Sequence, residues 1–175
     1  SLLFNKSDNP SLKSLSNIPQ FPLRSHFNNF VNNHDIDDLN KVSSYWIKSQ
    51  QIINLDKKVK FFKTHHALCK IKGSIFTNYE NSLGVIYIVR DPRNIVSSFA
   101  KFRNTTIENA AEFMIKSSGD GFTWTNTWSD NFNSWKIFKE YKRYMLIKYE
   151  DLIQNPELIF LNVLKFVYKL NNTKF

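Results

Sequence analysis

The stretch from Gly84 to Phe102, GVIYIVRDPRNIVSSFAKF, constrains the fold more than any other part of the sequence. It opens with an apolar, β-branched run at 85–89, which is typical of a strand buried on both faces. Pro92 disfavours helix in the residue before it, so the strand must stop there. Asp91 as N-cap and Pro92 at the first helical position then predict a helix. Its expected core-facing stripe is Ile95, Phe99 and Phe102.

The end of this predicted strand is suited to an anion. Open α/β sheets bind ligands beyond the carboxyl ends of their strands, where helix N-termini attract negative charge. Arg90 lies at that edge and Ser98 lies two turns into the helix. A guanidinium and a hydroxyl that converge on one point suit a phosphate. A surface Arg90 paired with Asp91, and a solvent-facing Ser98, would fit the spacing equally well, so both interpretations remain open here.

The segment IVRDPRNIVSSF resembles the 3′-phosphate-binding strand-turn-helix of the sulfotransferases that use 3′-phosphoadenosine 5′-phosphosulfate (PAPS). In that family Arg is followed by Asp or Asn, Pro, a basic residue, Asp or Asn, and a Ser four residues further on. The matching residues here are Arg90, Asp91, Pro92, Arg93, Asn94 and Ser98. The resemblance implies that Arg90 and Ser98 hold the 3′-phosphate of the nucleotide.

A second match follows a predicted strand at 58–62, KVKFF. The next residues, Lys63, Thr64 and His65, resemble the family's K-T-H, whose His is the catalytic base. Sulfuryl transfer requires the acceptor hydroxyl or amine to lose a proton, and a neutral imidazole is suited to take it near pH 7. Lys63 would place positive charge beside the transferring sulfuryl oxygens. We therefore expect His65, rather than His66, to be the base.

The sequence departs from the family directly after this motif. Better-known eukaryotic members continue K-T-H-L-P, whereas this chain continues His66-Ala67-Leu68 without a proline. The path of the loop and the acceptor pocket are therefore open. His66 could line the acceptor pocket or could be a solvated loop residue.

Two further matches lie in the last third of the chain. TWSDNFNSW resembles the family's S-W-x-x-H-V-x-x-W at Trp128 and Trp135, which we expect to pack in the core. Asn131 stands where the family usually has His, so no catalytic role is transferred to it. IKYEDL, on a predicted strand at 144–149, resembles F-Y-E-D-L and is followed by Asn-Pro, a helix start. By resemblance, Tyr149 packs near the adenine.

The remaining predicted elements are less distinctive. We expect a helix end at 1–4, a helix from Asp35 or Asp37 to Asn54, a short helix at 76–80, a helix from Thr105 or Thr106 to Lys116, and a flexible turn at 117–122. The inward stripe expected for the last helix is Leu158, Leu161, Val163, Leu164 and Val167.

Composition sets wider limits. A chain of 175 residues is long enough for one domain with a real core. The net charge of +9 favours anionic partners. The single cysteine, Cys69, excludes an internal disulfide and fits a reducing compartment, so we expect a cytoplasmic protein. No metal site is expected, because no Cys or paired carboxylate completes a metal set with His26 or His34. No apolar run reaches the roughly 18 residues of a membrane-spanning helix, and no signal peptide opens the chain.

The resemblance, carried by residues 61–166, implies a P-loop-like sulfotransferase fold: an α/β domain with a parallel sheet flanked by helices on both faces. Two family segments are not found in the sequence: the N-terminal 5′-phosphosulfate loop, of the T-Y-P-K-S-G-T-T-W type, and the C-terminal R-K-G-x-x-G-D-W segment. The chain also begins without Met. We therefore expect residues 1–175 to be one sulfotransferase domain, a fragment lacking both segments. Without the lysine of that loop, the fragment should be inactive alone.

The function expected from the resemblance is transfer of a sulfuryl group from PAPS to a hydroxyl or amine of a small molecule or glycan, with 3′-phosphoadenosine 5′-phosphate (PAP) as product. A nucleotide-binding P-loop kinase would need G-x-x-x-x-G-K-S/T, which the four glycines do not supply. A non-enzymatic basic module for nucleic acid or acidic glycans would need a continuous basic stripe, whereas Lys and Arg are scattered here. We expect no nucleic-acid partner. The acceptor and the oligomeric state are open.

Overall fold

The structure, a computed structural model, describes residues 19–116 and 125–172. The predicted helix end at 1–4 and the predicted turn at 117–122 lie outside these residues. In the described part the helices are α2 (Leu39–Val42), α3 (Trp46–Ile53), α4 (Pro92–Arg103), α5 (Ile107–Lys116), α6 (Trp128–Ser134), α7 (Tyr149–Gln154) and α8 (Pro156–Asn172). The 3₁₀ turns are η1 (Arg24–His26), η2 (Ser43–Tyr45), η3 (Asn54–Asp56) and η4 (Trp135–Lys139). The strands are β1 (Lys70–Ile71), β2 (Ser74–Ile75), β3 (Val85–Val89) and β4 (Tyr144–Lys148).

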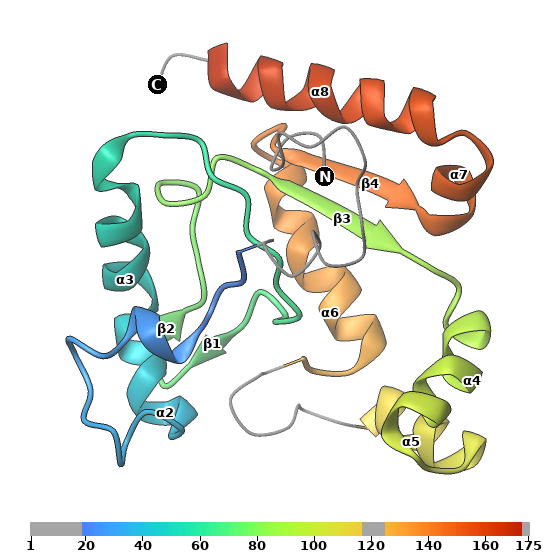
Figure 1. The fold of residues 1–175 in the computed structure, drawn as a ribbon, viewed down its shortest axis with the longest axis horizontal. Coiled ribbons are helices and arrows are strands. Elements are labelled where there is room, and N and C mark those ends of the chain that lie inside the picture. The colour runs from blue at the N-terminus through green and yellow to red at the C-terminus, as the bar shows by residue number, and fades with distance from the viewer. Residues whose placement is uncertain (1–18, 117–124, 173–175) are drawn as a thin grey trace, which may run out of the picture.

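The centre of the fold is a parallel pair of strands, β3 and β4. Their register places Val85 opposite Tyr144 and Val89 opposite Lys148. Helix α8 lies on one side of this pair and α6, continued by η4, lies on the other (Figure 1). The predicted α/β class, with a parallel sheet between helices, is therefore confirmed. At the start of β3, Gly84 allows close packing, because a Cβ there would overlap the side chain of Leu170 in α8.

The strand-turn-helix at the centre of the sequence also forms as predicted. Helix α4 has Pro92 in its first turn, and the Asp91 side chain accepts a hydrogen bond from the backbone N–H of Arg93 at 2.9 Å. The predicted burial is partly wrong. Ile88 is 55% exposed, because its face of β3 is left uncovered there by the described elements. Phe102 is 82% exposed, because α4 packs on α5 through Phe99 instead.

The predicted strand at 58–62 is wrong. This segment makes no ladder with a described strand, and only Lys63 is paired, in an isolated parallel bridge with Gln20. The backbone N–H of Phe21 donates to the Lys63 carbonyl at 3.0 Å, and the N–H of Lys63 donates to the Pro19 carbonyl at 2.9 Å. A strand requires a hydrogen-bonded neighbour along its length. The segment thus reaches the site as extended chain.

Other predicted elements need smaller corrections. The helix expected from Asp35 or Asp37 begins at Leu39, after the N-cap Asp38, whose side chain accepts from the N–H of Asn40. It is interrupted by η2. The short helix expected at 76–80 is absent; the antiparallel β1–β2 hairpin precedes this segment, which is irregular. The stripe expected on α8 is only partly inward. Leu158, Leu161 and Leu164 are exposed, whereas Leu170 is buried.

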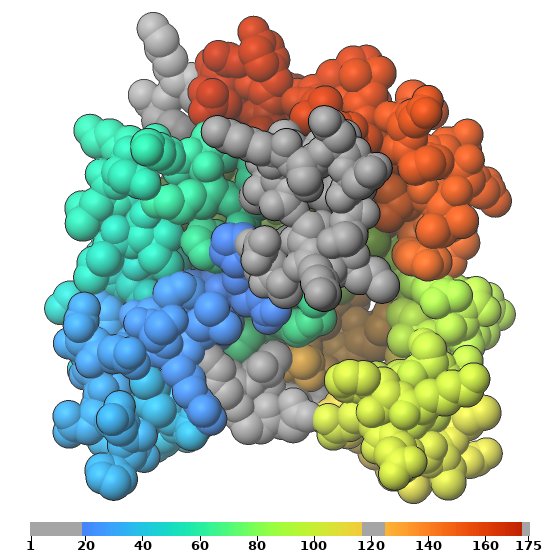
Figure 2. Space-filling view, in the orientation of Figure 1, coloured from blue at the N-terminus to red at the C-terminus, as the bar shows by residue number. Residues whose placement is uncertain are grey.

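The main hydrophobic core lies between the N-terminal helices and η4. It gathers large side chains from distant parts of the chain: Phe21, Phe27, Val42, Trp46, Phe76, Trp135 and Phe138. The α4–α5 pair forms a corner of the visible face, and α8 lies along its upper edge (Figure 2). Among the described helices, none combines the length and the apolar character needed to span a membrane.

Candidate active site

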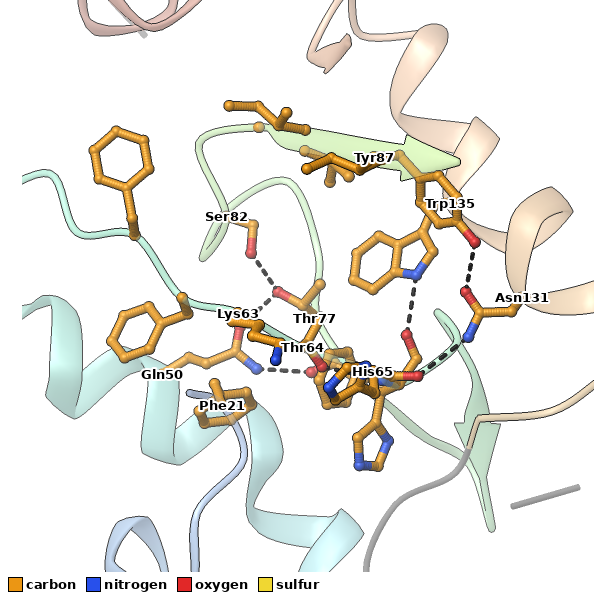
Figure 3. A pocket seen from close by; sticks show the side chains of 18 of the residues that line it. Phe21, Gln50, Lys63, Thr64, His65, Thr77, Ser82, Tyr87, Asn131 and Trp135 are labelled. Carbon is orange, nitrogen blue, oxygen red and sulfur yellow. Dashed lines mark hydrogen bonds between the residues drawn. The ribbon is translucent and has the colours of Figure 1, made fainter. Parts of the chain in front are cut away.

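The predicted base lies on a cavity of about 1460 Å³. The K-T-H segment supplies Lys63, Thr64 and His65 to its wall, facing Tyr87 of β3 and Asn131 of α6 (Figure 3). The structure therefore brings the two predicted catalytic residues, Lys63 and His65, to one surface. They reach it on extended chain that enters from α3 and leaves toward β1.

One face of α6 and η4 holds the backbone of this segment. The Asn131 side-chain amide donates to the His65 carbonyl at 3.2 Å, and the Trp135 indole N–H donates to the His66 carbonyl at 3.0 Å. The backbone N–H of Leu68 donates to the hydroxyl of Ser134 at 2.9 Å. Residues 131, 134 and 135 share a helix face because they are three and four positions apart. The chain that carries His65 is thus fixed at three successive points.

The Asn131 amide has two further partners. The hydroxyl of Tyr87 donates to its Oδ1 at 2.9 Å, and its Nδ2 also donates to the Thr125 carbonyl at 2.7 Å. Tyr87 is partly buried, and this burial raises its pKa to about 12. The phenol therefore remains a hydrogen-bond donor at neutral pH.

His65 itself is suited to take up a proton. It keeps solvent access, but burial on its inner side, followed by the charge of Lys63, lowers its pKa below the ordinary value. Both causes disfavour the protonated ring. The imidazole is therefore neutral at pH 7, which is the form that a general base requires.

His66 has a different environment. It is only 2% exposed, and its ring stacks on Phe76 with centroids 4.7 Å apart and planes 5° apart. The ring also meets Trp46 edge to face. His66 is a core residue at the back of the cavity wall, and its interpretation as a solvated loop residue is wrong.

The predicted nucleotide residues lie beyond the end of β3 and do not line this cavity. The guanidinium carbon of Arg90 lies 4.7 Å from the centroid of the Tyr149 ring, so these two of the three predicted nucleotide residues are in contact. Ser98 is exposed on α4, and its hydroxyl donates to the Ile95 carbonyl at 2.8 Å. Tyr149 opens α7 directly after β4.

The pairing of Arg90 with Asp91, left open by the sequence, does not occur. Asp91 is bonded instead to Arg93, whose side chain approaches it at 2.5 Å and, with its backbone N–H, lowers the pKa of Asp91 to about 2. Arg90 Nε is buried, and within the described residues it has no hydrogen-bond partner. A buried, unpaired guanidinium N–H over an aromatic ring is a ready donor to an anion.

Comparison with protein families decides the identity. A family model described as "Sulfotransferase domain" matches residues 7–172. The chain belongs to the sulfotransferase family. A search among curated proteins gives no match. The match extends well beyond the 61–166 span that carried the resemblance, and it supports a sulfuryl-transfer enzyme with a P-loop-like α/β fold.

The sulfotransferase site contains residues that the motifs did not single out for function. In the sequence Asn131 stands out only as a departure from the family's His and is given no catalytic role, Ser134 is only part of TWSDNFNSW, and Tyr87 is only part of the predicted strand. Their common signal is position: Asn131 and Ser134 lie on the helix face of the predicted core residue Trp135. Hydrogen-bonding side chains on a face predicted to be buried indicate a polar partner inside.

Two other features bear on the chemistry of this sulfotransferase. Within residues 19–116 and 125–172, no group of three or more His, Cys, Asp or Glu side chains could hold a metal ion. Burial raises the pKa of Cys69 to about 11. Its thiol therefore stays protonated at neutral pH and is a poor nucleophile.

Proposed function

We propose that this sulfotransferase domain uses PAPS as its donor and transfers the sulfuryl group to a hydroxyl or amine of a small molecule or glycan. The observation that carries the proposal is the state of His65: an imidazole with a lowered pKa, at the cavity wall, on a backbone fixed by α6. As the acceptor oxygen or nitrogen bonds to sulfur, its proton passes to His65. The bond from sulfur to the bridging oxygen breaks, and PAP is the product.

The other site residues have separate roles in this proposal. Lys63 places its charge near the sulfuryl oxygens, where negative charge has to be stabilised during transfer. Arg90 and Ser98 bind the 3′-phosphate, and Tyr149 lies near the adenine. The buried Nε of Arg90 and its contact with the Tyr149 ring support this assignment. For Ser98, the phosphate would take over the hydroxyl that now bonds to Ile95.

The proposal is tested first by calorimetric titration of the full-length protein with PAP. Adenosine 5′-phosphate, which lacks the 3′-phosphate, is the matched control ligand. We expect PAP to bind more tightly, because the 3′-phosphate adds charge-assisted hydrogen bonds. A protein that binds the two nucleotides equally, or binds neither, would contradict the nucleotide assignment.

A screen with PAPS labelled in its sulfuryl group then identifies the acceptor. Phenols, amines and glycans are offered in turn, and label in the product is counted. ATP labelled in its γ-phosphate is run in parallel. Transfer of phosphate from ATP, without sulfuryl transfer from PAPS, would favour the kinase alternative instead.

A further inference from the structure

We infer that Asn131 is a positioning residue for His65 and that Tyr87 orients its amide. This inference rests on the proposed function, in which His65 is the base. It goes beyond the family motif, because the motif has His at the position of Asn131 and gave no role to Tyr87.

The Asn131 side chain has hydrogen-bond partners at both its nitrogen and its oxygen. An Asn amide has two N–H donors and one carbonyl acceptor. Here the Nδ2 group of Asn131 donates to the carbonyls of His65 and Thr125, and its Oδ1 accepts a hydrogen bond from the hydroxyl of Tyr87. Three segments distant in sequence therefore fix the amide: the end of the K-T-H motif, the approach to α6, and β3. Figure 3 shows this line of bonds from Tyr87 through Asn131 to His65.

The tyrosine at the other end of this line is itself well placed. Its ring packs edge to face on Phe132, with centroids 5.7 Å apart, and lies beside Tyr144 of β4 at 6.4 Å. The position of the Asn131 amide is therefore linked to the β3–β4 sheet through Tyr87. Without the Tyr87 hydroxyl, Oδ1 of Asn131 would lose the hydrogen bond that it accepts from β3.

The K-T-H segment needs such support because its own backbone has little. Among the described residues, it has no strand beside it apart from the bridge at Lys63, and it lacks the proline found in the better-known eukaryotic members. The bonds from Asn131, Trp135 and Ser134 hold residues 65, 66 and 68 in turn. Only the first of these acts on the residue that carries the base.

Small displacements of a base have large kinetic effects. A catalytic group has to lie within hydrogen-bond reach of the proton it takes, and a misplacement of about 1 Å can cost about 100-fold in rate. Asn131 therefore affects kcat through the position of His65, and it does not touch the nucleotide residues.

The sharpest variant is Tyr87→Phe, which removes one hydroxyl and leaves the ring packing intact. Tyr144→Phe is the matched control, because the Tyr144 hydroxyl is also buried but has no hydrogen-bond partner among the described residues. In the full-length protein we expect Tyr87→Phe to lower kcat about 3- to 10-fold, the worth of one hydrogen bond. The Kd for PAP should not change, and Tyr144→Phe should leave kcat unchanged. Equal kcat in the two variants would overturn the role of Tyr87.

A second pair of variants tests whether Asn131 acts through His65. Asn131→Ala should lower kcat by about 10- to 100-fold, because the bond to the His65 carbonyl is lost together with the bonds to Thr125 and Tyr87. In a His65→Ala background the same substitution should cause almost no further loss, since residues that act as a unit are not additive. An equal loss of kcat in both backgrounds would show that Asn131 acts independently of His65.

Hydrogen exchange provides a readout that does not depend on activity. The backbone amides of 65–68 should exchange faster in Asn131→Ala than in the unmodified protein, whereas amides of β4 should not. Unchanged exchange at 65–68 would contradict the inference. The proposed function fails separately, if His65→Ala alone keeps a near-normal kcat.

Discussion

The segment that carries His65 and the region beyond β3 differ in how fully the protein's own side chains hold them. The segment that carries His65 is held by side chains of α6 and η4 at three points, and the imidazole of His65, the proposed base, is in the neutral form. The region beyond β3 is less complete. Arg90 has a buried N–H without a hydrogen-bond partner among the described residues, and Ser98 is exposed and bonded to its own helix.

In the proposed function, this difference separates what the protein positions from what the bound ligand would complete. A base has to be positioned before the acceptor arrives, so the protein itself fixes it. A buried donor without an acceptor costs about 1–3 kcal/mol, and a bound phosphate would remove that cost. In the proposed function the nucleotide would therefore complete its own end of the site, whereas the segment that carries His65 is held without a ligand. Variants at the two ends should consequently change different quantities.

The largest effect is expected at the base end. His65→Ala should lower kcat by about 10²–10⁴, the usual contribution of positioned proton transfer. The Kd for PAP should barely change, because His65 does not line the nucleotide region. Both quantities are measured by initial rates and calorimetry on the full-length protein.

The neighbouring histidine is the matched control for this prediction. His66 is buried against Phe76, so His66→Ala should lower the free energy of unfolding by about 2–5 kcal/mol through the cavity it leaves. The folded fraction should retain most of its kcat. A folded His66→Ala protein with a greater loss of kcat than His65→Ala would move the base to the other ring.

An intermediate effect is expected at the nucleotide end. Arg90→Ala should weaken PAP binding by about 10- to 150-fold, because charge-assisted bonds worth roughly 1.5–3 kcal/mol are lost. Ser98→Ala should cost less, roughly 0.5–1.5 kcal/mol, since a neutral hydroxyl is the weaker donor. Adenosine 5′-phosphosulfate, which lacks the 3′-phosphate, is the control ligand. If Arg90→Ala weakens both ligands by the same factor, Arg90 does not read the 3′-phosphate.

The smallest effect concerns pH. Because the base must be neutral, kcat falls as pH drops through the pKa of His65, and the lowered pKa places this fall below about 6.5, the ordinary value. Lys63→Met removes the second cause of the shift, so the acid limb of the profile should move upward toward 6.5. Burial, the larger cause, remains. Lys58→Met, on the same extended segment, is the control and should leave the limb in place. A limb that moves to lower pH in Lys63→Met would contradict the assigned cause.

The parts of the fold that could be predicted are those set by local chemistry. The β3–α4 unit follows from a β-branched run, a capping Asp91 and Pro92, which act within a few residues of one another. The strand at 58–62 could not be judged in this way, because it depends on a neighbour that the segment does not have among the described residues. The exposure of Phe102 likewise depends on which face of α4 meets α5.

The same distinction between local and distant contacts applies to the candidate site. Lys63, His65, Arg90, Ser98 and Tyr149 could be named because they match short motifs. The role of Asn131 could not, because its bonds reach Tyr87, 44 residues away, and His65, 66 residues away. Spacing along the chain carries no information about such contacts. The burial of His66 could not be predicted for a similar reason. It depends on Trp46, which lies earlier in the chain, and on Phe76, which lies later.

Hydrogen exchange with and without PAP tests the contrast between the two regions most directly. In the full-length protein, PAP should slow exchange of the amides from Arg90 to Ser98 and around Tyr149, where the ligand completes the site. Exchange of the amides from His65 to Leu68 should hardly change, because α6 already fixes that segment. Protection of 65–68 without protection of 90–98, or no protection of either region, would contradict the account.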